Sequence, residues 1–146
     1  MKVTIYTDGG ARRNPGPAAI GIVIQKQGQT LEKYSQFIGK KTNNQAEYEA
    51  VVFALKKTKL LFGKKKAKDM EIEVRVDSEL VAKQLNHQYK IKEKELQPLF
   101  LKAWNLILDF GQVSFKYIPR QQNKEADRLV NQALDGEEKT SSLPGL

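Results

Sequence analysis

The stretch that decides the fold reads Val3-Thr4-Ile5-Tyr6-Thr7-Asp8-Gly9-Gly10. Apolar and polar side chains alternate along it, which predicts a β-strand over residues 2–8 with one buried face. The strand ends on the carboxylate of Asp8, and the two glycines that follow leave the backbone bare. This arrangement suits metal-assisted chemistry, although an Asp-Gly pair is also a common turn. The role of Asp8 therefore depends on whether other parts of the chain bring partner groups to it.

The composition limits the chemistry that such a site could perform. The 146 residues fit one domain, with no cysteine and a single histidine, His87. Thiolate and histidine-rich zinc sites are excluded, so a bound metal must take oxygen ligands, which favours Mg²⁺ or Mn²⁺. The net charge of +8, from 25 Lys and Arg against 17 Asp and Glu, favours a polyanionic partner, although a basic surface without one fits equally.

No stretch approaches the roughly 18 apolar residues of a membrane span, and the first residues lack a signal-peptide core. We therefore expect a cytoplasmic protein without a membrane partner. The order of the expected elements indicates an α/β fold. Strands are expected at residues 2–8, 18–26, 30–38, 70–77 and 112–118, and helices at 42–62, 79–85, 95–110 and 123–134. Short links between the first three strands imply an antiparallel meander, and the later strand–helix–strand order implies a parallel pair.

Three further expectations concern the connections and the C-terminus. The lysine-rich residues 63–69 are expected to form a solvated loop, with contact to phosphates as the alternative. Trp104 is expected to lie in the core. We expect a domain over residues 1–135 and a polar tail over 136–146 that is loose or lightly docked.

Two glutamates on the first long helix are expected to differ in burial. Thr42 and Gln45 form a capping-box pattern that starts this helix. At 100° per residue, Glu47 is centred on the apolar face, whereas Glu49 points nearly the opposite way. A carboxylate turned into a core costs several kcal/mol unless it is paired or bound to a metal. Glu47 is thus a candidate site residue, with a partly solvated position at the helix start as the alternative.

Two other acids are placed to join Asp8 and Glu47. Asp77 ends the fourth expected strand, although it could simply cap the helix that follows. Asp127 lies at the edge of the apolar stripe of the last helix. Parallel strands would bring Asp8 and Asp77 within a few ångströms of each other. Four carboxylates in a basic protein suggest a two-magnesium site that acts on a phosphodiester.

Four motifs, in this order, resemble those of type 1 ribonuclease H. They are residues 6–17 (YTDGGARRNPGP) with Gly21, residues 42–48 (TNNQAEY), residues 76–81 (VDSELV) and residues 118–129 (IPRQQNKEADRL). The resemblance covers almost the whole chain. It implies a ribonuclease H-like fold with a five-stranded mixed sheet, three antiparallel strands followed by two parallel ones, flanked by helices.

The resemblance also implies an activity: endonucleolytic hydrolysis of the RNA strand of RNA–DNA hybrids, leaving 3′-hydroxyl and 5′-phosphate ends. The implied ligands of two Mg²⁺ ions, or Mn²⁺, are Asp8, Glu47, Asp77 and Asp127, with Asp8 bridging both ions and Glu47 near the RNA 2′-hydroxyl. The implied minor-groove contacts are the backbone of Gly9, Gly10 and Ala11 and the side chains of Asn14, Asn43 and Asn44. Thr42 matches a position that binds a DNA-strand phosphate. A monomer is expected, and double-stranded RNA is a further candidate substrate.

The sequence departs from many bacterial relatives at three places. Many bacterial relatives carry a histidine in the loop before the last helix, but residues 120–123 contain none. Arg120 is the candidate to take over part of the role of that histidine, as in the archaeal-like branch that this sequence resembles. Glu79 replaces a substrate-contacting glutamine, which would loosen the preference for the hybrid. The segment after His87 is too short for the full basic handle, which leaves DNA-strand binding to Tyr89, Lys90, Lys92 and general charge.

Two other readings of the fold are weaker. A proofreading-type exonuclease usually carries a second acid two residues after the first aspartate, where this chain has Gly10. A non-catalytic nucleic-acid-binding module would be expected to have lost at least one of the four acids, and all four are present.

Overall fold

The alternating residues of the opening stretch form the central strand of the sheet. In this computed structural model, which describes residues 1–141, the strand order is β3-β2-β1-β4-β5. The strands are β1 (Lys2–Ala11), β2 (Gly16–Lys26), β3 (Gln29–Lys41), β4 (Glu71–Val76) and β5 (Gln112–Tyr117). The first three pair antiparallel, whereas β4 runs parallel to both β1 and β5. The expected mixed five-stranded sheet is confirmed.

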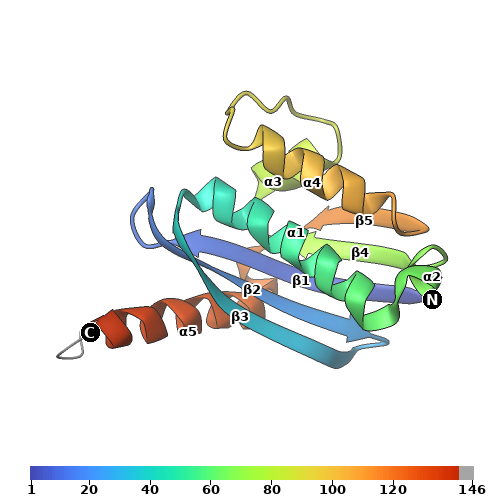
Figure 1. Ribbon diagram of the computed structural model, residues 1–146, viewed down its shortest axis with the longest axis horizontal. Coiled ribbons are helices and arrows are strands. Elements are labelled where there is room, and N and C mark those ends of the chain that lie inside the picture. Colours follow the sequence, from blue (N-terminus) through green and yellow to red (C-terminus); the bar gives the residue numbers. More distant parts are fainter. Residues whose placement is uncertain (142–146) are drawn as a thin grey trace.

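Helices cover both faces of the sheet (Figure 1). They are α1 (Asn43–Phe62), α2 (Lys64–Ala67), α3 (Glu79–Leu85), α4 (Gln97–Ile107) and α5 (Lys124–Ser141), with a short 3₁₀ turn η1 (Arg120–Gln122) before α5. On one face α1 crosses β1 and β2 and packs against α4, while α5 contacts β2 and β3. Most of the core lies between α1 and the sheet, where Val3, Ile5, Ile22, Leu55 and Ile72 are fully buried.

The first helix begins as its capping box predicts. The Gln45 N–H donates to the Thr42 hydroxyl (3.1 Å), and the Thr42 N–H donates to the Gln45 side-chain oxygen (2.9 Å). Two free N–H groups at the start of α1 are thereby satisfied. This cap places Glu47 two residues after Gln45 on the side of the helix that faces the sheet.

The strands are longer than expected around the first loop. Residues 9–11 and 16–17, expected in a loop, continue β1 and β2, and Ala11 pairs with Ala18 across the two strands. The composition of this segment is typical of a loop, but the hydrogen bonds of the ladder extend the strands past the glycines. The strand β3 likewise continues to Lys41, directly before the cap of α1.

Of the two expectations for the tail, loose or lightly docked, residues 136–141 fit the second, because they continue α5. Gly136 lies inside this helix, where glycine costs about 1 kcal/mol relative to alanine. Long-range pairing offsets this cost, because Arg12 contacts Asp135 (2.6 Å) and Glu138 (2.8 Å) on successive turns. The last five residues of the expected tail, 142–146, lie outside the described part of the chain.

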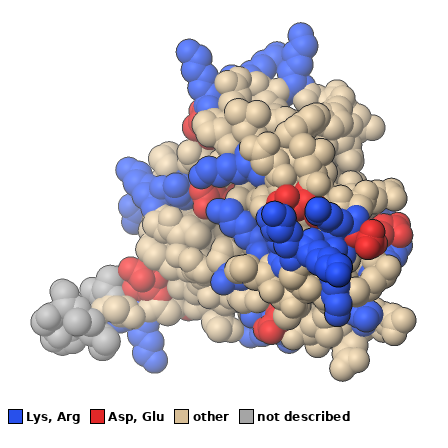
Figure 2. All heavy atoms as spheres, turned by 45° about the vertical axis from the view of Figure 1, so that its right-hand side comes forward, with Lys and Arg blue, Asp and Glu red and all other residues tan. Residues whose placement is uncertain are grey.

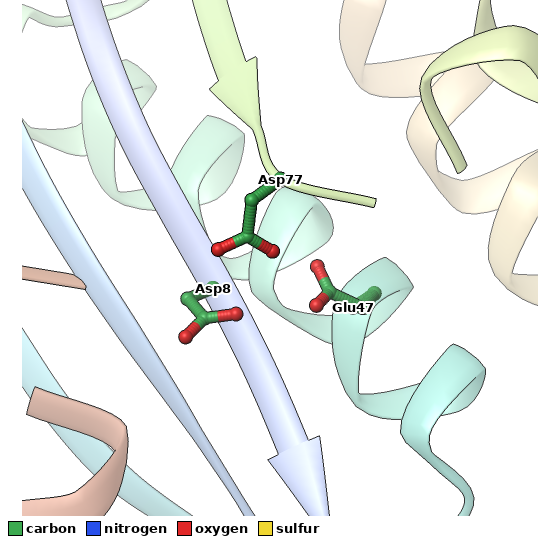
Figure 3. A group of neighbouring side chains, drawn as sticks. All are labelled: Asp8, Glu47 and Asp77. Carbon is green, nitrogen blue, oxygen red and sulfur yellow. The ribbon is translucent and has the colours of Figure 1, made fainter. Parts of the chain in front are cut away.

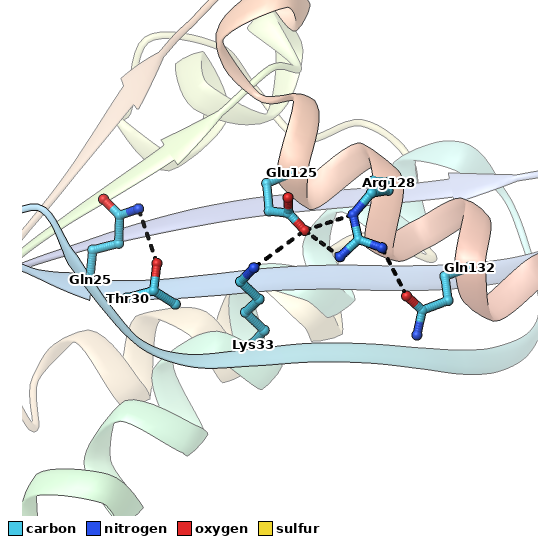
Figure 4. Close-up of polar contacts among 6 residues, drawn as sticks. All are labelled: Gln25, Thr30, Lys33, Glu125, Arg128 and Gln132. Atoms are coloured by element: carbon cyan, nitrogen blue, oxygen red, sulfur yellow. Dashed lines mark hydrogen bonds and ion pairs between the residues drawn. The ribbon is translucent and has the colours of Figure 1, made fainter.

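The start of α5 is attached to β3 by polar contacts (Figure 4). Glu125 accepts from the Arg128 guanidinium (2.8 Å) and lies 3.7 Å from the Lys33 ammonium. Gly21 allows the close approach of this helix, because a Cβ there would lie 2.2 Å from the backbone oxygen of Ala126. The helix that carries Asp127 is therefore held directly against the sheet.

Two other expectations are wrong. Trp104 is 43 % exposed and lies edge-on to the ring of His87, because α4 buries Leu99 and Ala103 instead. Residues 64–67 form the short helix α2 and are not a loop, with Ala67 fully buried. Within residues 1–141, no helix is both long and apolar enough to cross a membrane.

Candidate active site

Three of the four predicted carboxylates converge at one point. Asp8, Glu47 and Asp77 each offer an oxygen atom, and these atoms lie within 4.8 Å of one another. Figure 3 shows the three side chains turned towards each other, from β1, from α1 and from the residue after β4. Glu47 is only 8 % exposed, as the helical-face argument predicts. Glu49 lies 3.8 Å from the Lys41 ammonium at the surface.

The sheet register explains the meeting of the two aspartates. Thr7 of β1 pairs with Val76 of the parallel β4, so the next residue of each segment, Asp8 and Asp77, lies beside the other. Gly9 brings the glutamate to them, because a Cβ at this position would lie 2.2 Å from the Ala46 backbone and 2.6 Å from the Glu47 nitrogen. Only glycine allows α1 to come this close to β1.

Burial and mutual repulsion make these carboxylates easy to protonate. Burial and then the charge of Asp77 raise the pKa of Asp8 from 3.8 to about 7. Burial and then the charge of Asp8 raise the pKa of Glu47 well above its ordinary value, against a hydrogen bond from the Gly9 backbone. Burial also raises the pKa of Asp77, against a hydrogen bond from Asn123 and the charge of Arg120. A cation would relieve the repulsion among the three groups.

The unsatisfied oxygen of the cluster fits a hard cation. Glu47 Oε2 is buried and has no hydrogen-bond partner among residues 1–141. Buried polar atoms are normally hydrogen-bonded, so an orphan oxygen in an acidic cluster indicates a missing positive group. Closely spaced carboxylate oxygens are the ligands that Mg²⁺ and Mn²⁺ prefer. The residues present therefore fit the divalent metal that the sequence predicts.

Asp127 lies beside this group rather than within it. It is half-buried at the first turn of α5, and its charge adds to the effects that raise the pKa of Asp8. It lines the same open hollow, of about 460 Å³, as the other three carboxylates and Arg120. Asp127 thus lies next to the three clustered carboxylates, in the same hollow.

The predicted substrate contacts divide into those that line the hollow and those that do not. Lining it are Gly9, Gly10, Ala11, Asn43, Asn44 and Arg120. Asn14 and Thr42 stand just outside, where they support the wall. Asn14 Oδ1 accepts from the Asn43 N–H (2.9 Å), and Asn43 Oδ1 accepts from the Ala11 N–H (2.8 Å). These bonds fix the β1–β2 connection to the start of α1.

Glu79 and Tyr89 lie outside the hollow and share one lysine. The Lys83 ammonium lies 2.8 Å from the Glu79 carboxylate and donates to the Tyr89 hydroxyl (3.2 Å). It also lies 4.9 Å from the centre of the Tyr89 ring. The two predicted contacts therefore form a separate surface on and after α3.

Sequence reasoning missed Asn123, which supports the site, and did not single out Arg12, Ser78 and Asn131, which also line the hollow. The Asn123 side chain is 1 % exposed, and Nδ2 donates to the Thr7 carbonyl (2.8 Å) and to Asp77 Oδ2 (3.1 Å). An asparagine directly before a helix is most simply explained as an N-cap. No local pattern indicates that its side chain reaches Asp77 and Thr7, which lie 46 and 116 residues earlier in the chain.

Comparison with known proteins gives relatives over nearly the whole chain. Residues 6–133 match the family model described as "Reverse transcriptase-like". Ribonuclease HI of Halobacterium salinarum is 38 % identical over 138 residues, which are 92 % of this chain and 65 % of that protein. The bifunctional protein Rv2228c of Mycobacterium tuberculosis is 37 % identical, and the match covers 92 % of this chain and 36 % of that protein. The chain thus spans about a third of the mycobacterial relative.

Solved structures agree with this grouping. LC11-RNase H1, isolated from compost, has a TM-score of 0.87 and 48 % identity over 93 % of this chain and 97 % of its own. The same enzyme in complex with an RNA/DNA hybrid has a TM-score of 0.88 and 47 % identity over 92 % of this chain and 98 % of its own. With its mixed sheet, its cluster of Asp8, Glu47 and Asp77 and these relatives, the chain belongs to the type 1 ribonuclease H family.

Proposed function

We propose that the chain is an endoribonuclease that hydrolyses the RNA strand of RNA–DNA hybrids and leaves 3′-hydroxyl and 5′-phosphate ends. The observation that carries the proposal is the group of three carboxylate oxygens within 4.8 Å, one of them on a glutamate with an orphan buried oxygen. The complex of LC11-RNase H1 with an RNA/DNA hybrid supports this choice of substrate.

Two divalent ions, Mg²⁺ or alternatively Mn²⁺, are the proposed cofactors. Asp8, Glu47 and Asp77 would hold the first, and Asp127 with Asp8 the second. Such ions, when bound, stabilise the attacking and leaving oxygens of an in-line displacement and lower the pKa of a bound water. Because Asp8 and Glu47 are almost fully buried, solvent does not compete for their inner oxygens.

The protein's own residues would position the duplex. Gly10 has no side chain between the β1 backbone and the hollow, and Ala11, Asn43 and Asn44 lie along the same wall. Amide side chains can both donate to and accept from a 2′-hydroxyl, which is the group that distinguishes RNA from DNA. Arg120 lines the same hollow, and its charge lowers the pKa of Asp77. It is the group proposed to contact a phosphate in place of the missing histidine.

The test is a cleavage assay with end-labelled substrates. Purified protein with Mg²⁺ or Mn²⁺ is expected to cut the RNA of a hybrid at internal positions, and Asp8→Asn is expected to abolish cutting. Parallel reactions with double-stranded RNA and DNA define the substrate class, and phosphatase treatment of the products checks for 5′-phosphates. A hybrid that stays intact with both metals would refute the proposal. Light scattering checks the expected monomer.

A further inference from the structure

The basic excess of the chain is concentrated in one short segment that the proposed catalytic site does not use. Residues 56–68 (KKTKLLFGKKKAK) contain seven lysines and no acid. The rest of the chain therefore has 18 Lys and Arg against 17 Asp and Glu, from totals of 25 and 17. The net charge indicates a polyanionic partner, and this segment should make most of the contacts with it.

Five of these lysines form an exposed cluster, which we call the distal lysine cluster: Lys56, Lys64, Lys65, Lys66 and Lys68. Within residues 1–141, none of the five makes an ion pair, whereas Lys59 is paired with Asp109 (2.9 Å). Lys56 and Lys64 line one hollow of about 400 Å³ at the junction of α1 and α2. Figure 2 brings this end of the molecule forward and shows Lys and Arg side chains gathered across the face.

The backbone under the cluster is fixed. Ala67 is fully buried, and its carbonyl accepts from the Gly111 N–H (3.2 Å). The Met70 carbonyl accepts from the Gln112 N–H (3.1 Å). Gly111 packs so closely that a Cβ there would lie 2.9 Å from the Lys68 oxygen. The lysines thus extend from a docked helix, and binding would not have to order a loop.

The cluster lies at the end of the sheet opposite to the carboxylates. It adjoins the first residues of β4, whereas Asp77 follows the last residue of that strand. The six residues of β4 span about 20 Å. The 20 residues of α1 span about 30 Å, with Glu47 near the first residue of the helix and Lys64 just after its last. The lysines therefore lie too far from the carboxylates to contact the part of the duplex that is being cleaved.

The arrangement of the lysines favours an extended polyanion. Successive helical residues point about 100° apart, so Lys64, Lys65 and Lys66 spread their charges over a surface and cannot all contact one phosphate. Lysines act as flexible point charges that suit sequence-independent backbone contacts. We propose that the distal lysine cluster binds the phosphate backbone of nucleic acid beyond the segment under cleavage. Two-point attachment would then raise the affinity for long substrates.

The test compares two charge-reversal variants. K65E/K66E changes the cluster. K102E/K116E makes the same change in net charge at exposed lysines elsewhere that also make no ion pair within the described part of the chain. Binding is measured by fluorescence anisotropy in EDTA, with hybrids of about 12 and about 40 base pairs and a DNA duplex of about 40 base pairs. Anionic vesicles of phosphatidylserine and phosphatidylcholine form a separate arm.

We expect K65E/K66E to weaken binding of the long duplexes by at least about tenfold and to reduce the salt slope by about two, which is the loss of two phosphate contacts. Binding and cleavage of the short hybrid should stay within about twofold of wild type, which also shows that the variant folds. Equal losses in both variants, equal losses on short and long hybrids, no loss, or a loss confined to vesicles would each overturn the inference. Because binding is measured without metal, the result is independent of whether the protein cleaves hybrids.

Discussion

The buried amide of Asn123 holds the carboxylate of Asp77 at 3.1 Å and the backbone of β1 at 2.8 Å, through the same nitrogen. It thus connects the start of α5 with the middle of β1 and with the residue that follows β4. One side chain therefore positions a predicted metal ligand relative to Asp8, the residue that follows Thr7 in β1.

Removing this amide should weaken metal binding more than it weakens the fold. Asn123→Ala frees the Asp77 carboxylate to rotate, and loss of such supporting hydrogen bonds typically costs 10–100-fold, as an order of magnitude, in metal affinity or activity. Titration calorimetry with Mn²⁺ measures the affinity directly. Asn86→Ala is the control. It removes a hydrogen bond that the Asn86 side-chain amide donates to the Phe115 carbonyl, outside the carboxylate cluster. Unchanged Mn²⁺ affinity together with a lower melting temperature would assign Asn123 a purely structural role.

The two glutamates of α1 should respond differently to the same substitution. Glu47→Gln keeps the shape of a buried side chain but removes its charge, so hybrid cleavage should fall by about 10²-fold or more. Glu49→Gln removes only a 3.8 Å surface ion pair with Lys41, which is worth about 0–1 kcal/mol, and should leave cleavage within about twofold. Initial rates with saturating Mg²⁺ test this, and similar losses in both variants would contradict the assignment.

The metal-free protein should become more stable when Asp8 is neutralised, and only above acidic pH. The pKa of Asp8 is about 7 in the folded chain against an ordinary value of 3.8, so the folded state binds more protons in this interval. Stability is therefore lost as pH rises from about 4 to about 7. Asp8→Asn removes this loss, with an upper limit of about 4 kcal/mol at pH 8.

The measurement is denaturant unfolding of wild type and Asp8→Asn in EDTA at about pH 4 and about pH 8. The difference between the two proteins should be small at the lower pH and large at the higher one. Adding Mg²⁺ at the higher pH should reduce the difference, because the ion stabilises the wild type by binding its folded state. A difference independent of pH would contradict the role given to burial and repulsion.

The two glycines after Asp8 should have separable roles. Gly9→Ala places a methyl group 2.2 Å from the Ala46 backbone, which must push α1 away and cost several kcal/mol of stability. Gly10→Ala meets only the Val130 side chain at 3.6 Å, so the fold should be retained within about 1 kcal/mol. Since Gly10 lines the hollow, its substitution should instead weaken hybrid binding. Thermal unfolding and anisotropy distinguish the two, and an unstable Gly10→Ala would argue against this division.

Much of the site could be predicted because its signals are local. Three signals depend only on residues close together in the sequence. They are the alternation along β1, the Thr42–Gln45 cap and the position of Glu47 on the apolar face of its helix. The mixed sheet follows from short and long connections, which constrain strand direction. Predicting these features does not require knowing which elements pack together in the tertiary structure.

Other features could not be predicted because distant residues decide them. The extension of α5 past Gly136 depends on Arg12, more than 120 residues earlier. Trp104 has an apolar side chain, but α4 turns Leu99 and Ala103 to the core instead. The sequence of residues 64–66 is typical of a solvated loop. The segment is helical because Ala67 is hydrogen-bonded to the distant Gly111.

The sequence by itself determined the strands, the long helices, their order and the four candidate carboxylates, because hydrophobic period, capping and turn chemistry act over a few residues. Only the tertiary structure decided which of these carboxylates share a centre. The register of β1 with β4 places Asp8 beside Asp77, and the bare backbone of Gly9 admits Glu47. Asn123 holds Asp77 in place, and Asp127 lines the same hollow outside the group of three. Such distances arise from packing between elements far apart in the chain, which no local pattern encodes.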